Sequence, residues 1–257
     1  MKIPFVKYHG AGNDFVIIDS TKSTYPITQA EIAFICHRRF GVGADGLMLV
    51  ERSSEADFYM RYFNSDGNES TMCGNGGRCI SHYAHSLGLT GSTISFVGID
   101  GPHQATLQNP ERVKLKMINV SDAVEEKDFY FLNTGSPHHV IFEKNIIERD
   151  IVGEGKAIRY SSRYPKGTNV DFVEELGNNR IFVRTYERGV EDETYSCGTG
   201  VVASAIATYL KGNKSEHFEI ETRGGSLEVD FNHQKGEFFD VYLTGPVKFV
   251  FSGSIEV

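Results

Sequence analysis

The sequence predicts an α+β fold made of two similar domains, each a curved, mostly antiparallel sheet wrapped around a central helix. An internal repeat runs through the chain at a fixed offset of 124 positions, which places a C-G-N-G motif at residues 73–76 on C-G-T-G at 197–200. Apolar residues are arranged as in strands over most of each copy, and a helical segment follows each motif. Two copies of one α+β unit are therefore expected.

The repeat also predicts the domain boundaries. The same offset, without gaps, places Phe58 on Phe182 and Tyr62 on Tyr186. Two copies of 124 residues leave residues 249–257, whose apolar character is that of a strand returning to the first half. A polar, acidic stretch at 121–127 separates the copies. We expect a first domain of residues 1–120, completed by the strand 249–257, and a second domain of residues 121–248.

Within each copy the pattern indicates mostly strands and two helices. Strands are expected at residues 15–18, 58–63, 93–97 and 113–117, and at their counterparts one offset later. The T-Q-A-E sequence at 28–31 is a capping box and predicts a helix that ends at Gly41 and buries Cys36. The helix after the second motif, residues 201–207, is apolar nearly all round, which is typical of a helix enclosed by a sheet.

Composition excludes several classes of function. The 26 Lys and Arg residues are fewer than the 34 Asp and Glu residues, the formal net charge is −8, and no basic stripe indicates a nucleic-acid partner. No apolar run approaches the roughly 18 residues that a bilayer span needs, and the first ten residues lack the apolar core of a signal peptide. We expect a cytoplasmic protein with a small-molecule partner and no membrane association. Since twofold dimers are the commonest homo-oligomers, a homodimer is expected.

The two repeated cysteines carry the strongest chemical signal. Cys73 and Cys197 each stand at the predicted start of a helix, a position that lowers the pKa of a thiol below its usual value of about 8.5. The neighbouring glycines leave the first helical N–H groups free to hold an anion. If the two halves face each other, two sulfur atoms approach one ligand from opposite sides. That arrangement suits the removal of a proton from one face of a carbon and its return to the other face.

Other interpretations of these motifs are weaker. A C-G-x-G sequence also fits a tight turn with a buried cysteine, and paired thiols also form redox disulfides, but these two lack the C-x-x-C spacing. The glycines at 10 and 12 resemble a dinucleotide loop, yet residues 15–19 continue as a strand where such a loop needs a helix. No Walker A pattern or cluster of metal ligands is present in the sequence. We expect neither a cofactor nor a metal.

Three motifs in this order resemble those of the diaminopimelate epimerase family. They are H-G-A-G-N-D-F at 9–15, F-N-S-D-G at 63–67 leading to C-G-N-G-G-R-C at 73–79, and E-R-G at 187–189 leading to C-G-T-G at 197–200. The resemblance covers nearly the whole chain. It implies the interconversion of LL- and meso-diaminopimelate on the bacterial route to lysine and peptidoglycan, by two cysteines and without pyridoxal phosphate.

The resemblance also implies roles for individual residues. Cys73 and Cys197 would be the acid and the base, and His138 would assist proton movement at the cysteines. The Glu187 carboxylate would influence the nearby thiol, and Arg188 would grip a substrate carboxylate through two hydrogen bonds. The residues that would contact the substrate are Asn13, Asn64, Gly74, Asn75, Asn169, Glu187, Arg188, Gly198 and Thr199.

Two positions depart from one common version of the family pattern, and two alternative functions stay open. Ser136 stands where many members have asparagine, and Gly46 stands where some have glutamine, so contacts to the distal end of the substrate are in question. A proline or hydroxyproline racemase would share the fold and both thiols, but the asparagine-rich set suits a longer substrate. A ligand-binding protein without activity would not need to keep Cys73 and Cys197.

Overall fold

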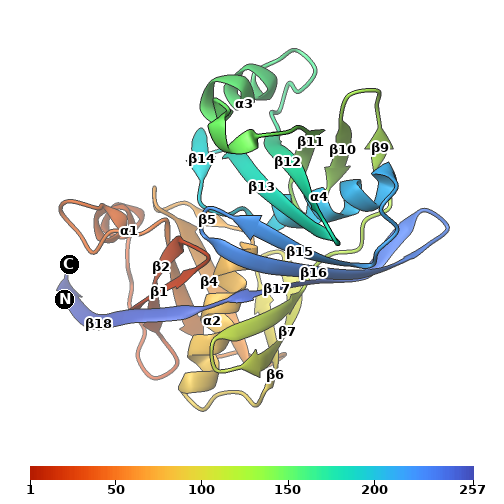
Figure 1. The fold of residues 1–257 in the computed structure, drawn as a ribbon. Helices are drawn as coiled ribbons and strands as arrows, with labels where there is room; N and C mark the ends of the chain where they lie inside the picture. Colours follow the sequence, from red (N-terminus) through yellow and green to blue (C-terminus); the bar gives the residue numbers. More distant parts are fainter. The chain divides into compact units, whose positions relative to one another are not determined.

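The computed structural model describes residues 1–257 and divides into two compact units (Figure 1). Unit 1 consists of Met1–Leu115 with Gly245–Val257, and unit 2 of Lys116–Thr244. The internal repeat predicts the same divisions a few residues later, at 120 and 248. Each unit combines a mixed sheet with two α-helices, so the predicted two-domain α+β fold is confirmed.

The strands of unit 1 form one sheet in the order β18, β1, β2, β3, β4, β6, β7, β8, with β5 also on β4. All of these pairs are antiparallel except β2 with β3 and β4 with β6. The elements are β1 (Lys2–Gly10), β2 (Asn13–Asp19), α1 (Gln29–Cys36), β3 (Gly46–Glu51), β4 (Phe58–Asn64), β5 (Glu69–Ser70), α2 (Gly74–Ser86), β6 (Thr93–Gly98), β7 (Gly101–Asn109), β8 (Arg112–Lys116) and β18 (Lys248–Glu256).

Helix α2 is the central helix of unit 1. It packs against β1, β2, β3 and β7, and nine of its thirteen residues are buried, including Cys79 and Ile80. The last strand of the chain, β18, pairs antiparallel with β1 along its length, from Lys2 opposite Glu256 to His9 opposite Lys248. The predicted returning strand is therefore confirmed, because residues 249–257 complete the sheet of the first unit.

Unit 2 repeats this order of strands: β9, β10, β11, β12, β13, β15, β16, β17, with β14 on β13. Its two parallel pairs, β11 with β12 and β13 with β15, are the counterparts of those in unit 1. The elements are β9 (Val124–Glu125), β10 (Tyr130–Asn133), β11 (Pro137–Phe142), a 3-10 turn (Ile146–Glu148), α3 (Ile151–Arg159), β12 (Asn169–Gly177), β13 (Arg180–Glu187), β14 (Asp192–Thr194), α4 (Gly198–Lys211), β15 (His217–Thr222), β16 (Gly225–Gln234) and β17 (Glu237–Pro246).

Helix α4 is the central helix of unit 2. It contacts β10, β11, β12, β13, β15 and β16, and the run from Gly200 to Thr208 is buried throughout. The sequence prediction of an apolar helix enclosed by a sheet is confirmed. No helix in either unit combines the length and the hydrophobicity that crossing a membrane requires.

One predicted boundary is wrong. The capping box of α1 forms as expected, with Thr28 accepting from the Glu31 N–H and the Glu31 carboxylate accepting from the Thr28 N–H, but the helix ends at Cys36 rather than at Gly41. His37 turns to an extended conformation, and its Nδ1 accepts from the N–H groups of Arg39 and Phe40. Gly41 then folds back onto the end of the helix, where a Cβ would lie 2.0 Å from the Phe34 carbonyl oxygen.

Candidate functional site

Cys73 is the N-cap residue of α2. Its backbone is extended, as is usual for an N-cap residue. The N–H groups that open a helix have no partner within it, and together with the helix dipole they favour an anion. The Cys73 thiol therefore lies beside the first residues of α2, Gly74 and Asn75, where the sequence predicts an anion site.

Asn13 contacts the Cys73 sulfur, and Asn75 contacts Asn13. The Sγ atom lies 3.5 Å from Asn13 Oδ1, which also accepts a hydrogen bond of 3.2 Å from Asn75 Nδ2. Asn75 is 1 % exposed, whereas Asn13 and Cys73 are partly exposed. The structure thus brings together three of the predicted residues, and Asn13 contacts the predicted catalytic sulfur directly.

Asn64 and Gly46 lie at the same edge of the unit 1 sheet as Asn13. Asn64 ends β4, is exposed, and stands opposite Gly46 in the register of β3 and β4. A Cβ at Gly46 would lie 2.6 Å from the Tyr62 ring and 2.7 Å from the Phe63 carbonyl oxygen. Glycine is required at position 46 because the aromatic ring of Tyr62 occupies the space that a side chain there would fill.

Cys197 is the N-cap residue of α4, and it is buried. Burial, together with the charges of Glu187 and Asp171, raises the pKa of its thiol well above the usual range, against opposing hydrogen bonds from Thr199 and the Gly200 N–H. The expected increase in ionisation at the helix N-terminus is therefore wrong for Cys197. Desolvation and two carboxylates outweigh the helix dipole.

His138 is fully buried between Asp171 and Thr199. Its Nδ1 lies 2.6 Å from Asp171 Oδ2, and its Nε2 lies 2.9 Å from Thr199 Oγ1, which is 3.5 Å from the Cys197 sulfur. A carboxylate beside Nδ1 holds the proton there, so in the neutral imidazole Nε2 accepts from the Thr199 hydroxyl. The Cys197 proton therefore faces a hydrogen-bonded path to His138.

Asp171 is a site residue that the sequence motifs did not predict, although its position on the strand carries a signal. Asn169 and Asp171 are two positions apart on β12, so both side chains lie on one face of the strand. Strand β11 pairs parallel with β12 and places His138 opposite Asn169. Asp171 also accepts a hydrogen bond of 2.7 Å from Thr185 Oγ1, which fixes the carboxylate that orients the histidine.

Asn169 supports the neighbouring loop of unit 2. Its Oδ1 accepts from the Arg188 backbone N–H at 2.8 Å, and its Nδ2 donates to the Pro137 carbonyl oxygen at 3.1 Å. Arg188 itself is exposed and donates to the Lys166 carbonyl oxygen at 3.4 Å. Ser136 lies in the loop before β11, where its carbonyl oxygen accepts from the Thr134 N–H.

The other two cysteines lie inside the packed core. Cys36 and Cys79 are buried, and burial raises the pKa of each thiol to about 12. Both are neutral thiols at physiological pH. The predicted packing role of Cys36 and Cys79 agrees with these environments.

The profile of the family described as diaminopimelate epimerase matches residues 5–121 and 130–250. The diaminopimelate epimerase of Flavobacterium psychrophilum is 47 % identical over 252 residues, covering 97 % of this chain and 98 % of the relative. The chain belongs to the diaminopimelate epimerase family. It is an isomerase that acts on diaminopimelate, in the biosynthesis of lysine and of the peptidoglycan precursor.

Solved structures show how widely the fold is shared. A phenazine biosynthesis protein of the PhzF family from Bacillus anthracis is 16 % identical, with a TM-score of 0.78 and full coverage of both chains. A hydroxyproline epimerase from Agrobacterium vitis, determined with bound trans-4-hydroxy-L-proline, is 15 % identical, with a TM-score of 0.73 over 99 % of this chain and 92 % of the other. At these identities the likeness concerns the fold alone.

Proposed function

We propose that Cys73 and Cys197 are the two proton-transfer groups of the epimerase. One sulfur, as thiolate, takes the proton from the substrate Cα, and the other, as thiol, delivers its proton to the opposite face. The reverse reaction exchanges these roles. The observation that supports this most strongly is that each cysteine is the N-cap residue of a central helix, so in both units a thiol lies beside the N–H groups of the first helical turn.

We propose that His138 relays the proton of Cys197. The raised pKa of that thiol means that it does not ionise unaided at neutral pH. His138 can accept the thiol proton through the Thr199 hydroxyl, which leaves Cys197 as a thiolate that can act as a base on the substrate. Asp171 stabilises the imidazolium that forms at His138. Glu187 disfavours the thiolate further, so it assists the return of the proton to Cys197 in the second half of the cycle.

The remaining predicted residues would hold the substrate. Backbone N–H groups at Gly74 and Asn75, and at Gly198 and Thr199, suit the carboxylate next to the reacting carbon. The exposed guanidinium of Arg188 suits the second carboxylate of a long substrate, and Asn64 the second amino-acid head. Asn169 supports the proposal indirectly, because its amide holds the Arg188 backbone.

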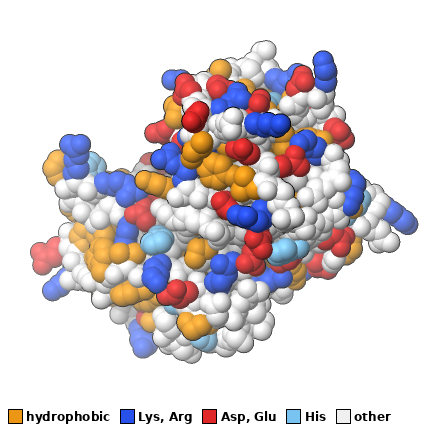
Figure 2. All heavy atoms as spheres, in the orientation of Figure 1, with side chains coloured by type: hydrophobic (Ala, Val, Ile, Leu, Met, Phe, Trp, Pro, Cys, Tyr) orange, Lys and Arg blue, Asp and Glu red, His pale blue; other side chains and the backbone are white.

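We also propose two pseudo-symmetric epimerase domains and a cytoplasmic homodimer without nucleic acid. The dimer is supported by three consecutive apolar side chains on β18, Phe249, Val250 and Phe251, which are 49 %, 50 % and 44 % exposed. Apolar side chains gather over this strand in Figure 2, and a second apolar group lies higher on the face shown, among interspersed acidic and basic side chains. An apolar strand surface of this kind is typical of an interface.

The assignment is tested in deuterated water. Proton NMR with LL-diaminopimelate should show both inversion to the meso isomer and deuterium at one Cα, because a thiol exchanges its proton with solvent. Proline treated in parallel should show neither change. Cys36→Ala is the matched control for Cys73→Ala and Cys197→Ala. Retention of epimerisation by either catalytic variant would remove that cysteine from the mechanism.

A further inference from the structure

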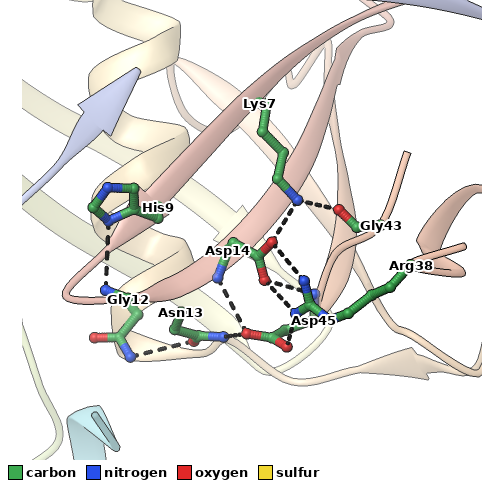
Figure 3. Close-up of polar contacts among 9 residues, drawn as sticks. Lys7, His9, Gly12, Asn13, Asp14, Arg38, Gly43 and Asp45 are labelled. Carbon is green, nitrogen blue, oxygen red and sulfur yellow. Dashed lines mark hydrogen bonds and ion pairs between the residues drawn. The ribbon is translucent and has the colours of Figure 1, made fainter. Parts of the chain in front are cut away.

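A chain of side-chain hydrogen bonds runs through the two asparagines beside Cys73. Arg78 Nη2 donates to Asn75 Oδ1 at 2.8 Å, and Asn75 Nδ2 donates to Asn13 Oδ1 at 3.2 Å. Asn13 Nδ2 then donates to Asp45 Oδ2 at 2.6 Å, as Figure 3 shows. In each of these three hydrogen bonds the donor lies on the Arg78 side and the acceptor on the Asp45 side.

The Arg78 end of the chain can only donate. Its guanidinium is 0 % exposed, its Nη1 donates to the Gly74 carbonyl oxygen at 3.3 Å, and its Nε has no acceptor. Burial lowers the pKa of Arg78 to about 10, and the other groups that influence it are Cys73, Cys79 and Arg112. Arg78 is therefore a cation at neutral pH, and Asn75 must turn its oxygen toward it.

The Asp45 end of the chain can only accept. Its Oδ1 accepts from Arg38 Nη2 at 2.7 Å, and its Oδ2 also accepts from the Asp14 backbone N–H at 3.2 Å. Arg38 makes two hydrogen bonds to Asp14, which also pairs with the buried Lys7 (Figure 3). Burial acts to raise the pKa of Asp14, but hydrogen bonds and charge from Arg38 and Lys7 outweigh it and lower it to about 2.

The two ends together decide which atom of Asn13 faces the catalytic sulfur. With its NH₂ group on Asp45, Asn13 presents Oδ1 to Cys73 Sγ, and an oxygen acceptor favours a thiol over a thiolate. The opposite orientation would present an N–H to the sulfur and favour the thiolate. We propose that Asp45, held by Arg38, is a positioning residue that fixes the Asn13 amide and keeps Cys73 protonated until the reaction begins.

This proposal rests on the proposed function only in taking Cys73 as a proton-transfer group. It complements the relay at Cys197, because a pair that inverts a centre needs one sulfur to start with a proton. The second copy lacks the device: one offset later, Asn13, Asp45 and Arg78 correspond to Pro137, Asn169 and Val202. Asn169 Nδ2 instead bonds the Pro137 carbonyl oxygen.

The test measures the rate at which iodoacetamide alkylates Cys73 as a function of pH, by peptide mass spectrometry on the intact ligand-free protein. In Asp45→Ala, Asn13 loses the acceptor of its Nδ2 group, and only the Asn75 Nδ2 donor still opposes a turn of the Asn13 N–H toward the sulfur. Alkylation of Cys73 at pH 7 should rise about fivefold, the value of one hydrogen bond, while epimerase activity falls. A merely structural role would lower activity and stability without making Cys73 more reactive.

Asp45→Asn is the matched control, because it removes the same charge but keeps an acceptor. Two N–H donors, from Asn13 Nδ2 and the Asp14 backbone, face one position of the new amide, whereas the other position faces only Arg38, which is exposed and keeps its two bonds to Asp14. The amide oxygen therefore faces Asn13, and the alkylation profile of the variant should stay within about twofold of the wild type. Equal shifts in Asp45→Ala and Asp45→Asn would mean that charge, not orientation, acts on Cys73, and would overturn the proposal.

A double-mutant cycle shows whether Asp45 acts through Asn13. In an Asn13→Ala background, Asp45→Ala should change the alkylation rate by less than about twofold, and a persisting fivefold rise would contradict the proposal. If Asp45→Ala does not fold, Asp45→Ser takes its place, since its hydroxyl is too short to reach the Asn13 amide. A different result would contradict the proposed function itself: epimerisation by the Cys73→Ala variant, which the alkylation experiments do not measure.

Discussion

Gly200→Ala offers a sharp test of the His138 and Asp171 arrangement. Gly200 is the third residue of α4, where alanine would ordinarily stabilise a helix by about 1 kcal/mol. Here, however, a Cβ would lie 2.4 Å from Asp171 Oδ1 and 3.2 Å from Thr185 Oγ1. The carboxylate would have to move by roughly 1 Å to restore a normal contact. That movement pulls Asp171 away from His138 or Thr185.

The structure sets the size of the effect. Loss of one hydrogen bond to a charged acceptor lowers the free energy of unfolding by about 1.5–3 kcal/mol, against the gain of about 1 kcal/mol from helix propensity. Gly76→Ala is the matched control, since Gly76 is the counterpart of Gly200 in α2 and its added Cβ would meet only Met48 Sδ at 3.3 Å and the edge of Phe15. A flexible methionine adjusts to such a contact.

Urea unfolding and steady-state kinetics measure both variants. We expect Gly200→Ala to be about 2 kcal/mol less stable than Gly76→Ala and to lose at least about tenfold in kcat, because His138 loses the carboxylate that orients it. Equal stability and equal activity of the two variants would refute the role given to Asp171.

Three further predictions concern charge, thiols and cofactors. Burial lowers the pKa of His139 to about 4, below its ordinary value of about 6.5. The free energy of unfolding should therefore be highest above about pH 6.5 and fall by about 1.4 kcal/mol per pH unit toward pH 4. Urea unfolding across that range should show the decline, and His139→Phe should flatten it. Cys36→Ser should retain epimerase activity in a coupled assay, since Cys36 is a buried neutral thiol, and inactivity of the folded variant would contradict its packing role. Activity should survive both a chelator and hydroxylamine, and inhibition by either would count against acid–base chemistry by thiols alone.

The fold was predictable because its signals are local or repeated. The capping box at Thr28 and Glu31, the glycines after Cys73 and Cys197, and the apolar run of α4 each specify one element from neighbouring residues. The repeat then carried each assignment to the second unit. Even β18 was visible, because nine residues, five of them apolar, remained after two complete copies.

The parts of the site that were missed depend on contacts between distant residues. Asp45 hydrogen-bonds Asn13, which lies 32 positions away in the sequence, and Asp171 hydrogen-bonds His138, which lies 33 positions away. Contacts at such separations leave no helix or strand periodicity in the sequence. The environment of Cys197 was misjudged for the same reason. Its position at a helix N-terminus is local, but its burial beside Glu187 and Asp171 is set by tertiary packing.

The central claim, that each cysteine serves one face of the substrate carbon, is tested most directly by isomer-specific exchange in single-cysteine variants. In deuterated water, Cys73→Ala and Cys197→Ala each keep one sulfur, which can remove and return a proton on its own face but cannot invert the centre. Mass spectrometry should show deuterium at Cα of the LL isomer with one variant and of the meso isomer with the other, with configuration retained in both. Inversion by either variant, or exchange of both isomers by the same variant, would contradict the account.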